Sequence, residues 1–281
     1  MYRALPVFNP QRRAEAGKQF IDVGIAEEHM VAMAAGIAKN GGKPVILDAA
    51  TFLQRTYDQL TQDMALNNNA VTILSFPLGG GISPMDATHS SAFDLAMMST
   101  IPNLRVLSPA TKEELLAMLD WSLEQTDFPV MIRVPGGKVQ TYDAGKAFNG
   151  DLSNQVTVKG NTVALLGLGA FYDLALRTKD ALKAELGIDA TVVNPRLSSE
   201  VDADTLESLK ADHSLVVTLE DGVLDGGFGE KVSRFYGLAD MKVLNIVMKK
   251  EVNDRVPMDE LVARYHLSPE LIVKDVKAIL K

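Results

Sequence analysis

The sequence predicts an α/β protein of two domains, each a mostly parallel twisted sheet flanked by helices. The chain has 281 residues, about twice the length of a typical domain. Short continuous apolar runs alternate with longer amphipathic stretches, as in sheets whose parallel strands are connected by helices. Between residues 136 and 161 the alternation stops, and glycines scattered among polar residues indicate a linker.

The first half of the chain contains five expected strands separated by helices. Each strand is a short apolar run without strict alternation, which is typical of strands buried on both faces. The expected strands are Phe20–Gly24, Pro44–Asp48, Val71–Phe76, Leu104–Ser108 and Val130–Val134. The expected helices are Ala26–Lys39, Thr51–Asn67, Ala92–Ser99 and Thr111–Gln125. The first of these helices is apolar nearly all round, which predicts that it is buried.

The alternation restarts after the linker. The expected strands are Thr162–Leu166, Ala190–Val193, Leu215–Leu219 and Val243–Val247, and the expected helices are Ala170–Leu186, Ala203–Lys210, Gly227–Tyr236 and Met258–Tyr265. A last helix is expected after Ser268, which precedes a proline suited to the first helical position. The turn from Gly167 to Tyr172 resembles a dinucleotide-binding turn, but Tyr172 replaces its third glycine, so we interpret it as a simple helix entry.

Composition excludes several classes of protein. No apolar run is long enough to span a membrane. The formal net charge of −8 argues against nonspecific nucleic-acid binding. The absence of cysteine excludes disulfides, thiolate metal sites and cysteine nucleophiles, and the four histidines are too scattered to suggest a zinc site. The N-terminus lacks the apolar core of a secretory signal, so we expect an intracellular, cytoplasmic protein.

Two segments carry candidate functional groups where expected strands end. Glu27, Glu28 and His29 follow the first expected strand and open the first helix, at the edge where open α/β sheets bind ligands. The alternative is that the two glutamates only complement the helix dipole. Asp86 and His89 follow three consecutive glycines, and they are candidate acid–base groups or parts of a capped surface loop.

At these residues the chain resembles the transketolase family of thiamine-diphosphate enzymes. The similar stretches are Phe20–His29, Ala50–Gln59, Thr88–Asp94 and Ile101–Ala110. The stretch Phe52–Gln59 is most similar to the 1-deoxy-D-xylulose-5-phosphate synthase branch. The resemblance implies a pyrimidine-binding domain over residues 1–137 that is short at its N-terminus, a linker over 138–160, and a transketolase C-terminal domain over 161–281.

The resemblance also implies roles for single residues. Glu27 corresponds to the glutamate that hydrogen-bonds N1′ of the cofactor's aminopyrimidine, and Phe52 to the aromatic residue that stacks on that ring. Arg55 corresponds to an arginine near the cofactor and the substrate channel. His89 corresponds to a histidine that faces the substrate and handles protons. His29 matches the synthase branch and is a candidate substrate contact.

Some positions depart from the family pattern. The family aspartate that lies four residues before the histidine is Met85 here, and Asp86, one residue nearer, is a candidate substrate contact in its place. Two arginines that hold the substrate phosphate in the synthase are absent from the segments Phe76–Gly79 and Val134–Lys138. Losing two such anion-binding groups should weaken phosphate binding. The donor or acceptor sugar is therefore expected to differ from glyceraldehyde 3-phosphate.

The family's Gly-Asp-Gly motif for Mg²⁺ is also absent, and Glu220-Asp221-Gly222 is an imperfect echo of it in the other domain. We therefore expect thiamine diphosphate and Mg²⁺ to bind only together with a partner chain that carries the diphosphate-binding domain. The expected protein is either a homodimeric C-terminal subunit or a C-terminal fragment of a transketolase or synthase-like transferase, which moves or condenses a two-carbon unit on sugar phosphates or ketoses. The alternatives are a 2-oxoacid dehydrogenase β subunit and a non-catalytic dimerisation relative.

Overall fold

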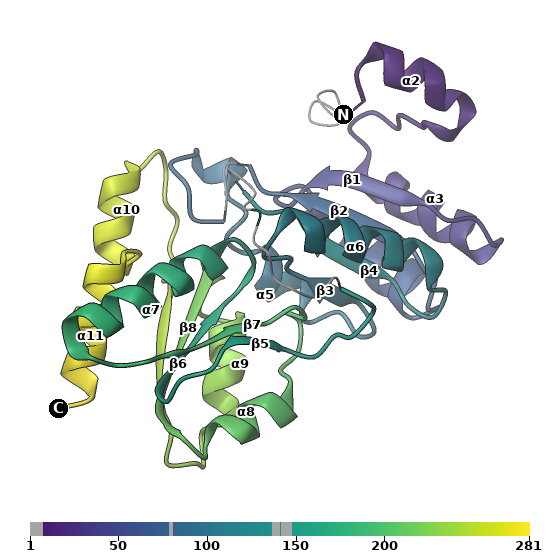
Figure 1. Ribbon diagram of the computed structural model, residues 1–281. Helices are drawn as coiled ribbons and strands as arrows, with labels where there is room; N and C mark the ends of the chain where they lie inside the picture. The colour runs from purple at the N-terminus through teal and green to yellow at the C-terminus, as the bar shows by residue number, and fades with distance from the viewer. Residues whose placement is uncertain (1–7, 79–80, 137–140, 142–147) are drawn as a thin grey trace.

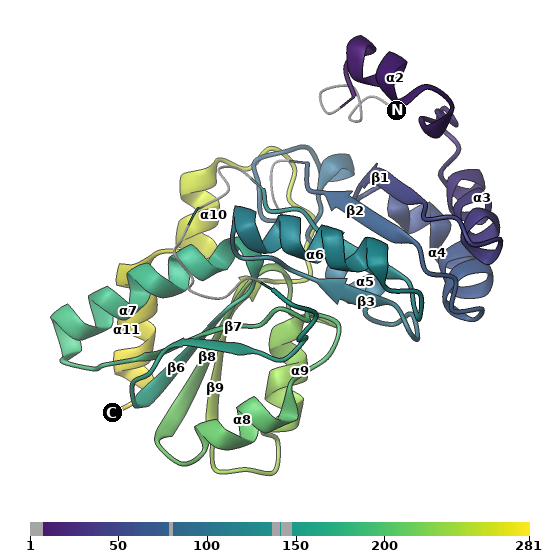
Figure 2. The ribbon, with the colours of Figure 1, turned by 45° about the vertical axis from the view of Figure 1, so that its right-hand side comes forward.

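The computed structural model describes residues 8–78, 81–136, 141 and 148–281 (Figure 1). It contains two sheets, each flanked by helices, and the two domains that they form lie side by side in contact (Figure 2). The predicted class, two α/β domains with mostly parallel sheets, is confirmed. Within the described part of the chain, no helix is long and apolar enough to cross a membrane.

The first sheet has four parallel strands in the order β1-β2-β4-β3. Its strands are β1 (Val45–Ala49), β2 (Thr72–Phe76), β3 (Arg105–Leu107) and β4 (Val130–Arg133). One face packs against α3 (Glu27–Lys39), the π-helical segment η3 (Leu60–Ala65) and α5 (Asp94–Met98), and the other against α6 (Lys112–Glu124). All four carboxyl strand ends therefore lie at one edge, where we expected the site.

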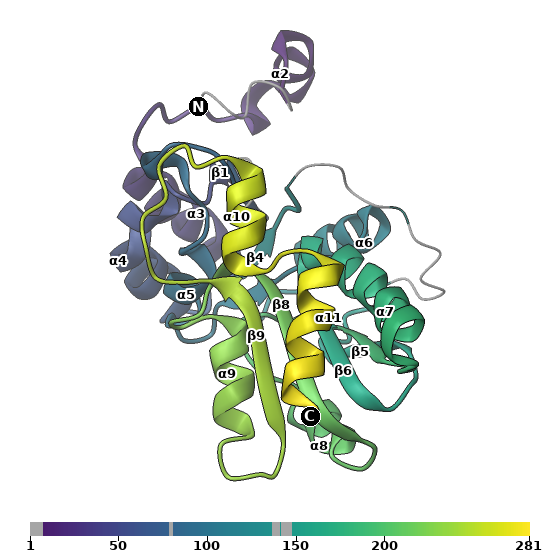
Figure 3. The same cartoon turned by 90° about the vertical axis from the view of Figure 1, so that its left-hand side faces the viewer.

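The expected strand Phe20–Gly24 is wrong. Between the short turn η1 (Gly17–Gln19) and α3 the backbone joins no sheet, and Ile21 and Ile25 are 54% and 82% exposed. Phe20 instead packs on Phe8, at 5.2 Å between ring centroids. The preceding helix α2 (Pro10–Ala16) stands away from the sheet and buries no residue (Figure 3). An apolar run forms a strand only when a neighbour offers hydrogen bonds, and none does so here.

Two predictions about helices of the first domain also need correction. The stretch Thr51–Asn67 is not one helix but a 3₁₀ turn, η2 (Leu53–Thr56), followed by α4 (Tyr57–Gln59) and η3. The Thr56 and Thr61 hydroxyls donate to backbone carbonyls within this stretch, and such bonds bend helices. The helix α3 is not buried all round, because its outer side is exposed.

The second sheet has the order β5-β7-β6-β8-β9. Its parallel strands are β6 (Thr162–Gly167), β7 (Thr191–Asn194), β8 (His213–Val223) and β9 (Lys242–Met248). The strand β5 (Gln155–Val158) runs antiparallel to β7, so residues expected in the linker belong to this sheet. Helices α7 (Tyr172–Leu186), α10 (Met258–Tyr265) and α11 (Pro269–Ile279) cover one face, and α8 (Ala203–Leu209) and α9 (Phe228–Phe235) the other.

Sequence signals for helix starts in this domain are confirmed. The Ser268 hydroxyl accepts a hydrogen bond from the Leu271 N–H and caps α11, whose first residue is Pro269. The glycine-rich turn after β6 leads through a 3₁₀ turn, η5 (Gly169–Phe171), into α7. The turn is therefore a helix entry, as predicted. A Cβ at Gly167 would lie 2.8 Å from the Cβ of Ala175, so a glycine is needed where α7 packs on the end of β6.

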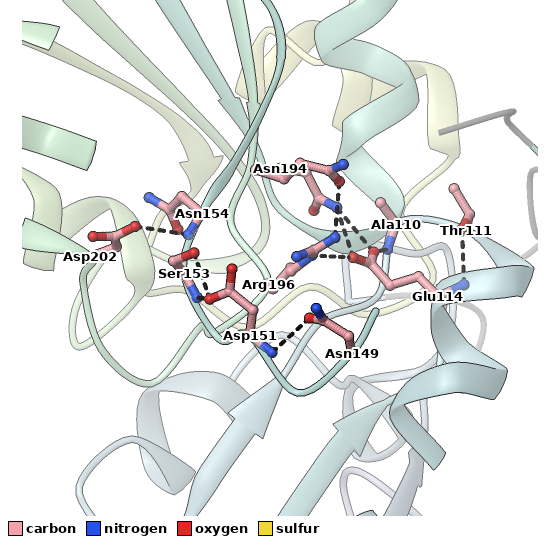
Figure 4. A network of polar contacts seen from close by, with 11 residues as sticks. Ala110, Thr111, Glu114, Asn149, Asp151, Ser153, Asn154, Asn194, Arg196 and Asp202 are labelled. Atoms are coloured by element: carbon pink, nitrogen blue, oxygen red, sulfur yellow. Dashed lines mark hydrogen bonds and ion pairs between the residues drawn. The ribbon is translucent and has the colours of Figure 1, made fainter. Parts of the chain in front are cut away.

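Buried polar groups join the two domains. Glu114 of α6 accepts hydrogen bonds from Arg196 Nε at 2.8 Å and from Asn194 Nδ2 at 3.0 and 3.1 Å (Figure 4). Arg133 of β4 bonds Asp221 of β8 at 3.0 Å. The Ser108 and Ser198 hydroxyls are 3.0 Å apart, and Leu107 and Leu197 form an isolated antiparallel bridge. These contacts fix the orientation of the second domain beside the carboxyl edge of the first sheet.

Candidate active site

The candidate site begins with Glu27, the first residue of α3. Its side chain is nearly buried, and its Oε2 accepts a hydrogen bond from Arg55 Nη1 at 3.1 Å. Arg55 comes from η2, the turn that follows β1. Among the described residues the other oxygen, Oε1, has no hydrogen-bond partner. The pair therefore presents a fixed carboxylate with one oxygen left for a ligand.

Phe52 and His89 come together from separate loops. Their rings meet edge to face, with centroids 5.7 Å apart and planes at 77°. The Thr51 hydroxyl donates to the Thr88 carbonyl at 3.1 Å, which ties the loop after β1 to the loop after β2. The segments that contain Phe52 and His89, which the sequence placed only at the same sheet edge, are thus in direct contact.

The His89 side chain is held by its own turn, η4 (Ala87–His89). Its Nδ1 lies 2.9 Å from Asp86 Oδ1 and 2.9 Å from the Thr88 hydroxyl. Hydrogen bonds from the Thr88 hydroxyl and then from His89 lower the pKa of Asp86 to about 2, so this carboxyl is ionised at neutral pH. The arrangement directs Nε2 of the imidazole away from Asp86, as the ring nitrogen available to a ligand.

His29 is not part of this group. It follows Glu27 by two residues, which places it about 200° around α3 from that glutamate. Its side chain is exposed. The structure therefore brings together Glu27, Arg55, Phe52 and the Asp86–His89 pair, and leaves His29 outside.

Sequence reasoning missed Asp48, which lies at the carboxyl end of β1. Its Oδ1 accepts a hydrogen bond from the Ala49 N–H at 2.7 Å, while its buried Oδ2 has no partner among the described residues. Burial, together with the nearby charge of Glu27, raises the pKa of Asp48 to about 6. The available signal was a single acid that closes the apolar run Val45–Leu47.

Behind the site, Arg133 forms a buried ion cluster. Its Nε and Nη2 bond the two oxygens of Asp94 at 2.9 and 3.0 Å, and its Nη1 bonds Asp221. Burial nevertheless raises the pKa of Asp94 above its usual range. Because both ends of the guanidinium are engaged, we interpret Arg133 as a structural cation. Gly79 and Lys138, in the segments that lack the family arginines, lie outside the described residues.

The segment Glu220-Asp221-Gly222 is a helix cap and not a metal site. The Glu220 carboxylate accepts the Phe228 and Gly229 N–H groups, at 2.8 and 3.0 Å, where α9 begins. Burial raises the pKa of Glu220 to about 7. Within the described ranges, no group of three or more His, Cys, Asp or Glu side chains is arranged to hold a metal ion.

Family models of transketolase domains and curated synthases are similar to this chain over most of its length. The family described as transketolase, pyrimidine binding domain, matches residues 7–141, and transketolase, C-terminal domain, matches residues 153–272. The chain is 36% identical over 276 residues to the 1-deoxy-D-xylulose-5-phosphate synthase of Dechloromonas aromatica (strain RCB), and 32% identical over 271 residues to that of Clostridium tetani (strain Massachusetts / E88). These alignments cover 94% and 93% of this chain but only 42% of each relative.

A solved structure is also similar. A split-gene transketolase, described as an inactive β4 tetramer, superposes with a TM-score of 0.83 and 25% sequence identity. The superposition covers 95% of this chain and 85% of that one. Two transketolase domains in succession, supported by both sequence and fold, show that the chain belongs to the transketolase family.

Proposed function

We propose that the chain is the pyrimidine-binding and C-terminal part of a thiamine-diphosphate-dependent transferase of the transketolase or 1-deoxy-D-xylulose-5-phosphate synthase type. Its reaction moves or condenses a two-carbon unit on sugar phosphates or related ketoses. The observation that carries the proposal is the Glu27 carboxylate, which is nearly buried at the carboxyl edge of the first sheet with Oε1 unpartnered. The names of the similar synthases and of the split transketolase support it.

The residues around Glu27 fit the aminopyrimidine half of the cofactor. A carboxyl oxygen without a partner can share a proton with a ring nitrogen, and such charge-assisted bonds are strong. Arg55 fixes the orientation of that carboxylate, and its N–H donates to the carbonyl of Phe52, whose ring is the aromatic surface of the same turn. When bound, thiamine diphosphate supplies a carbanion centre and an electron sink. The protein's part is to place the ring and to hold the proton at its nitrogen.

His89 is suited to the substrate side of the same site. The Asp86 carboxylate and the Thr88 hydroxyl hold Nδ1, so that Nε2 can exchange a proton with a substrate oxygen. An ionised carboxylate behind an imidazole also stabilises the cation that forms when the ring takes a proton.

We infer that residues outside these two domains hold the diphosphate and Mg²⁺. The described part of this chain offers no metal-binding cluster. The chain spans about 42% of the length of the synthases it matches, and the similar split transketolase is encoded as separate chains. We infer a partner chain that carries the diphosphate-binding domain, with two copies of each chain in the active assembly.

The proposal is tested by mixing the chain with a diphosphate-binding partner and measuring thiamine-diphosphate-dependent ketol transfer. Glu27→Gln is expected to lower kcat by about 100-fold, because an amide cannot exchange a proton with the ring nitrogen. Glu28→Gln is the matched control, since Glu28 is the exposed neighbour on the same helix.

Calorimetry of the complex with thiamine diphosphate and Mg²⁺ separates the alternatives. Binding together with ketol transfer that depends on Glu27 supports the proposal. Binding with acyl transfer to a lipoyl domain would instead identify a 2-oxoacid dehydrogenase subunit. A folded complex that binds no cofactor would identify a non-catalytic dimerisation relative, and equal rates for Glu27→Gln and the wild type would contradict the assigned role.

A further inference from the structure

Two segments that lie far apart in the chain meet beside the candidate substrate side of the site. Residues 251–257 of the second domain, between β9 and α10, reach the loop that follows β2 (Figure 1). The Ala87 N–H donates to Asp254 Oδ1 at 3.1 Å. The Arg255 N–H donates to the Met85 carbonyl at 3.0 Å. The second domain thus holds the loop immediately before and after Asp86.

Asp254 supplies a cap to the turn that carries His89. The first N–H groups of a helical turn have no partner within it. Asp86 accepts the Thr88 N–H at 3.1 Å, and Asp254 accepts the Ala87 N–H. Because Asp86 also lies 2.9 Å from His89 Nδ1, any displacement of this turn moves the carboxylate and the imidazole together.

The backbone of the second domain is strained at this contact. Arg255 has a φ of +52°, in the left-handed region that residues with a Cβ rarely adopt. Such conformations persist where the surrounding structure holds them, and the hydrogen bond to Met85 is a contact of that kind. The Asp254 and Arg255 side chains are 59% and 73% exposed, so core packing does not account for the arrangement.

The attachment of the two domains does not depend on Asp254. The buried pairs Glu114–Arg196 and Arg133–Asp221 join the domains elsewhere. Removing the Asp254 carboxylate therefore leaves the interface in place and acts on the turn alone. This makes a positioning role separable from a general loss of stability.

We propose that Asp254 is a positioning residue for His89, through which the C-terminal domain completes the substrate side of the site. The expected effect of Asp254 on catalysis rests on the proposed function. Its effect on the turn rests only on the hydrogen bonds from the Ala87 N–H to Asp254 and from the Arg255 N–H to the Met85 carbonyl. Proton transfer depends steeply on the placement of the acid or base, so a looser turn slows the chemical step.

The catalytic consequence is measured in the complex with the diphosphate-binding partner. Asp254→Ala is expected to lower kcat for ketol transfer about tenfold, with the affinity for thiamine diphosphate unchanged. Asp254→Asn keeps an acceptor oxygen for the Ala87 N–H and is expected to stay within about threefold of the wild type. Asp259→Ala, which removes an exposed carboxylate from the first turn of α10, is the matched control and is expected to leave kcat unchanged.

The structural part is measured on the full chain by amide hydrogen exchange. The Thr88 amide is the probe, because its own partner, Asp86, is untouched by the substitution. Its exchange is expected to become about tenfold faster in Asp254→Ala and to return to the wild-type rate in Asp254→Asn. The melting temperature is expected to change by less than about 2 °C.

Unchanged exchange at Thr88 in Asp254→Ala would overturn the proposal. So would faster exchange with an unchanged kcat in an active complex. A wild-type complex that binds partner and cofactor but transfers no ketol group would refute the proposed function, and Thr88 exchange would still decide whether Asp254 holds the turn.

Discussion

Burial and hydrogen bonding shift the pKa values of single carboxyl groups in opposite directions. Asp48 lies at the carboxyl end of β1, and Asp86 lies in the loop after β2. Asp86 is partly exposed and hydrogen-bonded, and its pKa falls to about 2, whereas burial raises the pKa of Asp48 to about 6. One edge of the sheet therefore holds a carboxylate that is ionised at any physiological pH beside a carboxyl group that takes up a proton in mild acid.

The raised pKa of Asp48 predicts a pH-dependent stability. A carboxyl group with a higher pKa in the folded chain than its ordinary 3.8 binds its proton more tightly when folded. Its ionisation therefore lowers the free energy of unfolding as the pH rises from about 4 to 6, and the loss is complete above that range. Asp48→Asn removes this loss. Relative to the wild type, its free energy of unfolding is expected to be about 2 kcal/mol higher at pH 7.5 than at pH 4.

Urea unfolding of both proteins at the two pH values measures this difference. A stability difference that is the same at both pH values would show that the Asp48 proton is not coupled to folding.

At the residue scale, sequence predicted the parts of the site that follow one another in the chain. Glu27 and His89 are expected at the ligand edge because each follows an apolar run, but the run before Glu27, Phe20–Gly24, forms no strand. Contacts between loops were beyond prediction, because the Phe52–His89 edge-to-face contact and the Ala87–Asp254 hydrogen bond depend on how separate segments fold back. Asp48 was missed because its burial, and not its sequence position, gives it its raised pKa.

At the scale of elements, the start of α6 shows how a local signal is reused. Thr111 accepts a hydrogen bond from the Glu114 N–H at 3.1 Å, and the Glu114 carboxylate accepts the Ala110 N–H at 2.8 Å. The arrangement is a variant of the capping box, because the carboxylate accepts the N–H of the residue before the cap and not that of Thr111 itself. The same carboxylate also receives Arg196 and Asn194 of the second domain (Figure 4). The cap of one helix is therefore also an anchor for the other domain.

Removing the cap hydroxyl is expected to destabilise the protein. Thr111→Ala is expected to lower the free energy of unfolding by about 1 kcal/mol, since the Glu114 N–H loses its partner. Thr111→Ser keeps the hydroxyl and is expected to lose much less. Equal losses in the two variants, measured by urea unfolding, would mean that packing of the methyl group matters and not the cap.

Sequence predicted most elements because their signals are local. Apolar runs located all the sheet strands except β5, and the Ser268-Pro269 cap signal located the start of α11. Phe20–Gly24 has the composition of a strand but no neighbour to pair with, and Phe20 packs on Phe8 instead. The segment Gln155–Val158 has little apolar character, and only pairing with β7 makes it a strand.

At the scale of the whole molecule, buried charge holds the two domains together. Arg196 is 6% exposed, and besides Glu114 it bonds Gln155 of β5 at 3.1 Å. A buried ion pair is costly to break on one side only, because the remaining charge stays without a partner. The two domains are therefore expected to unfold in one transition.

Arg196→Met is expected to lower the free energy of unfolding by about 3 kcal/mol, because it leaves the buried Glu114 carboxylate without a charged partner. The double variant Glu114→Gln with Arg196→Met removes both charges and is expected to recover part of the loss. Denaturant titration of the single and double variants gives the coupling between the two side chains. A loss below about 1 kcal/mol in Arg196→Met would mean that water replaces the lost partner.

Glycine 81 lies where the loop after β2 crosses the second domain. A Cβ on this residue would lie 1.6 Å from the Asp221 carbonyl oxygen, which is backbone and has no rotamer to change. Gly81 therefore acts as a spacer between the domains. A saturation library at position 81 should return glycine alone among folded variants. Related sequences that keep this contact between the domains are therefore expected to keep glycine at this position.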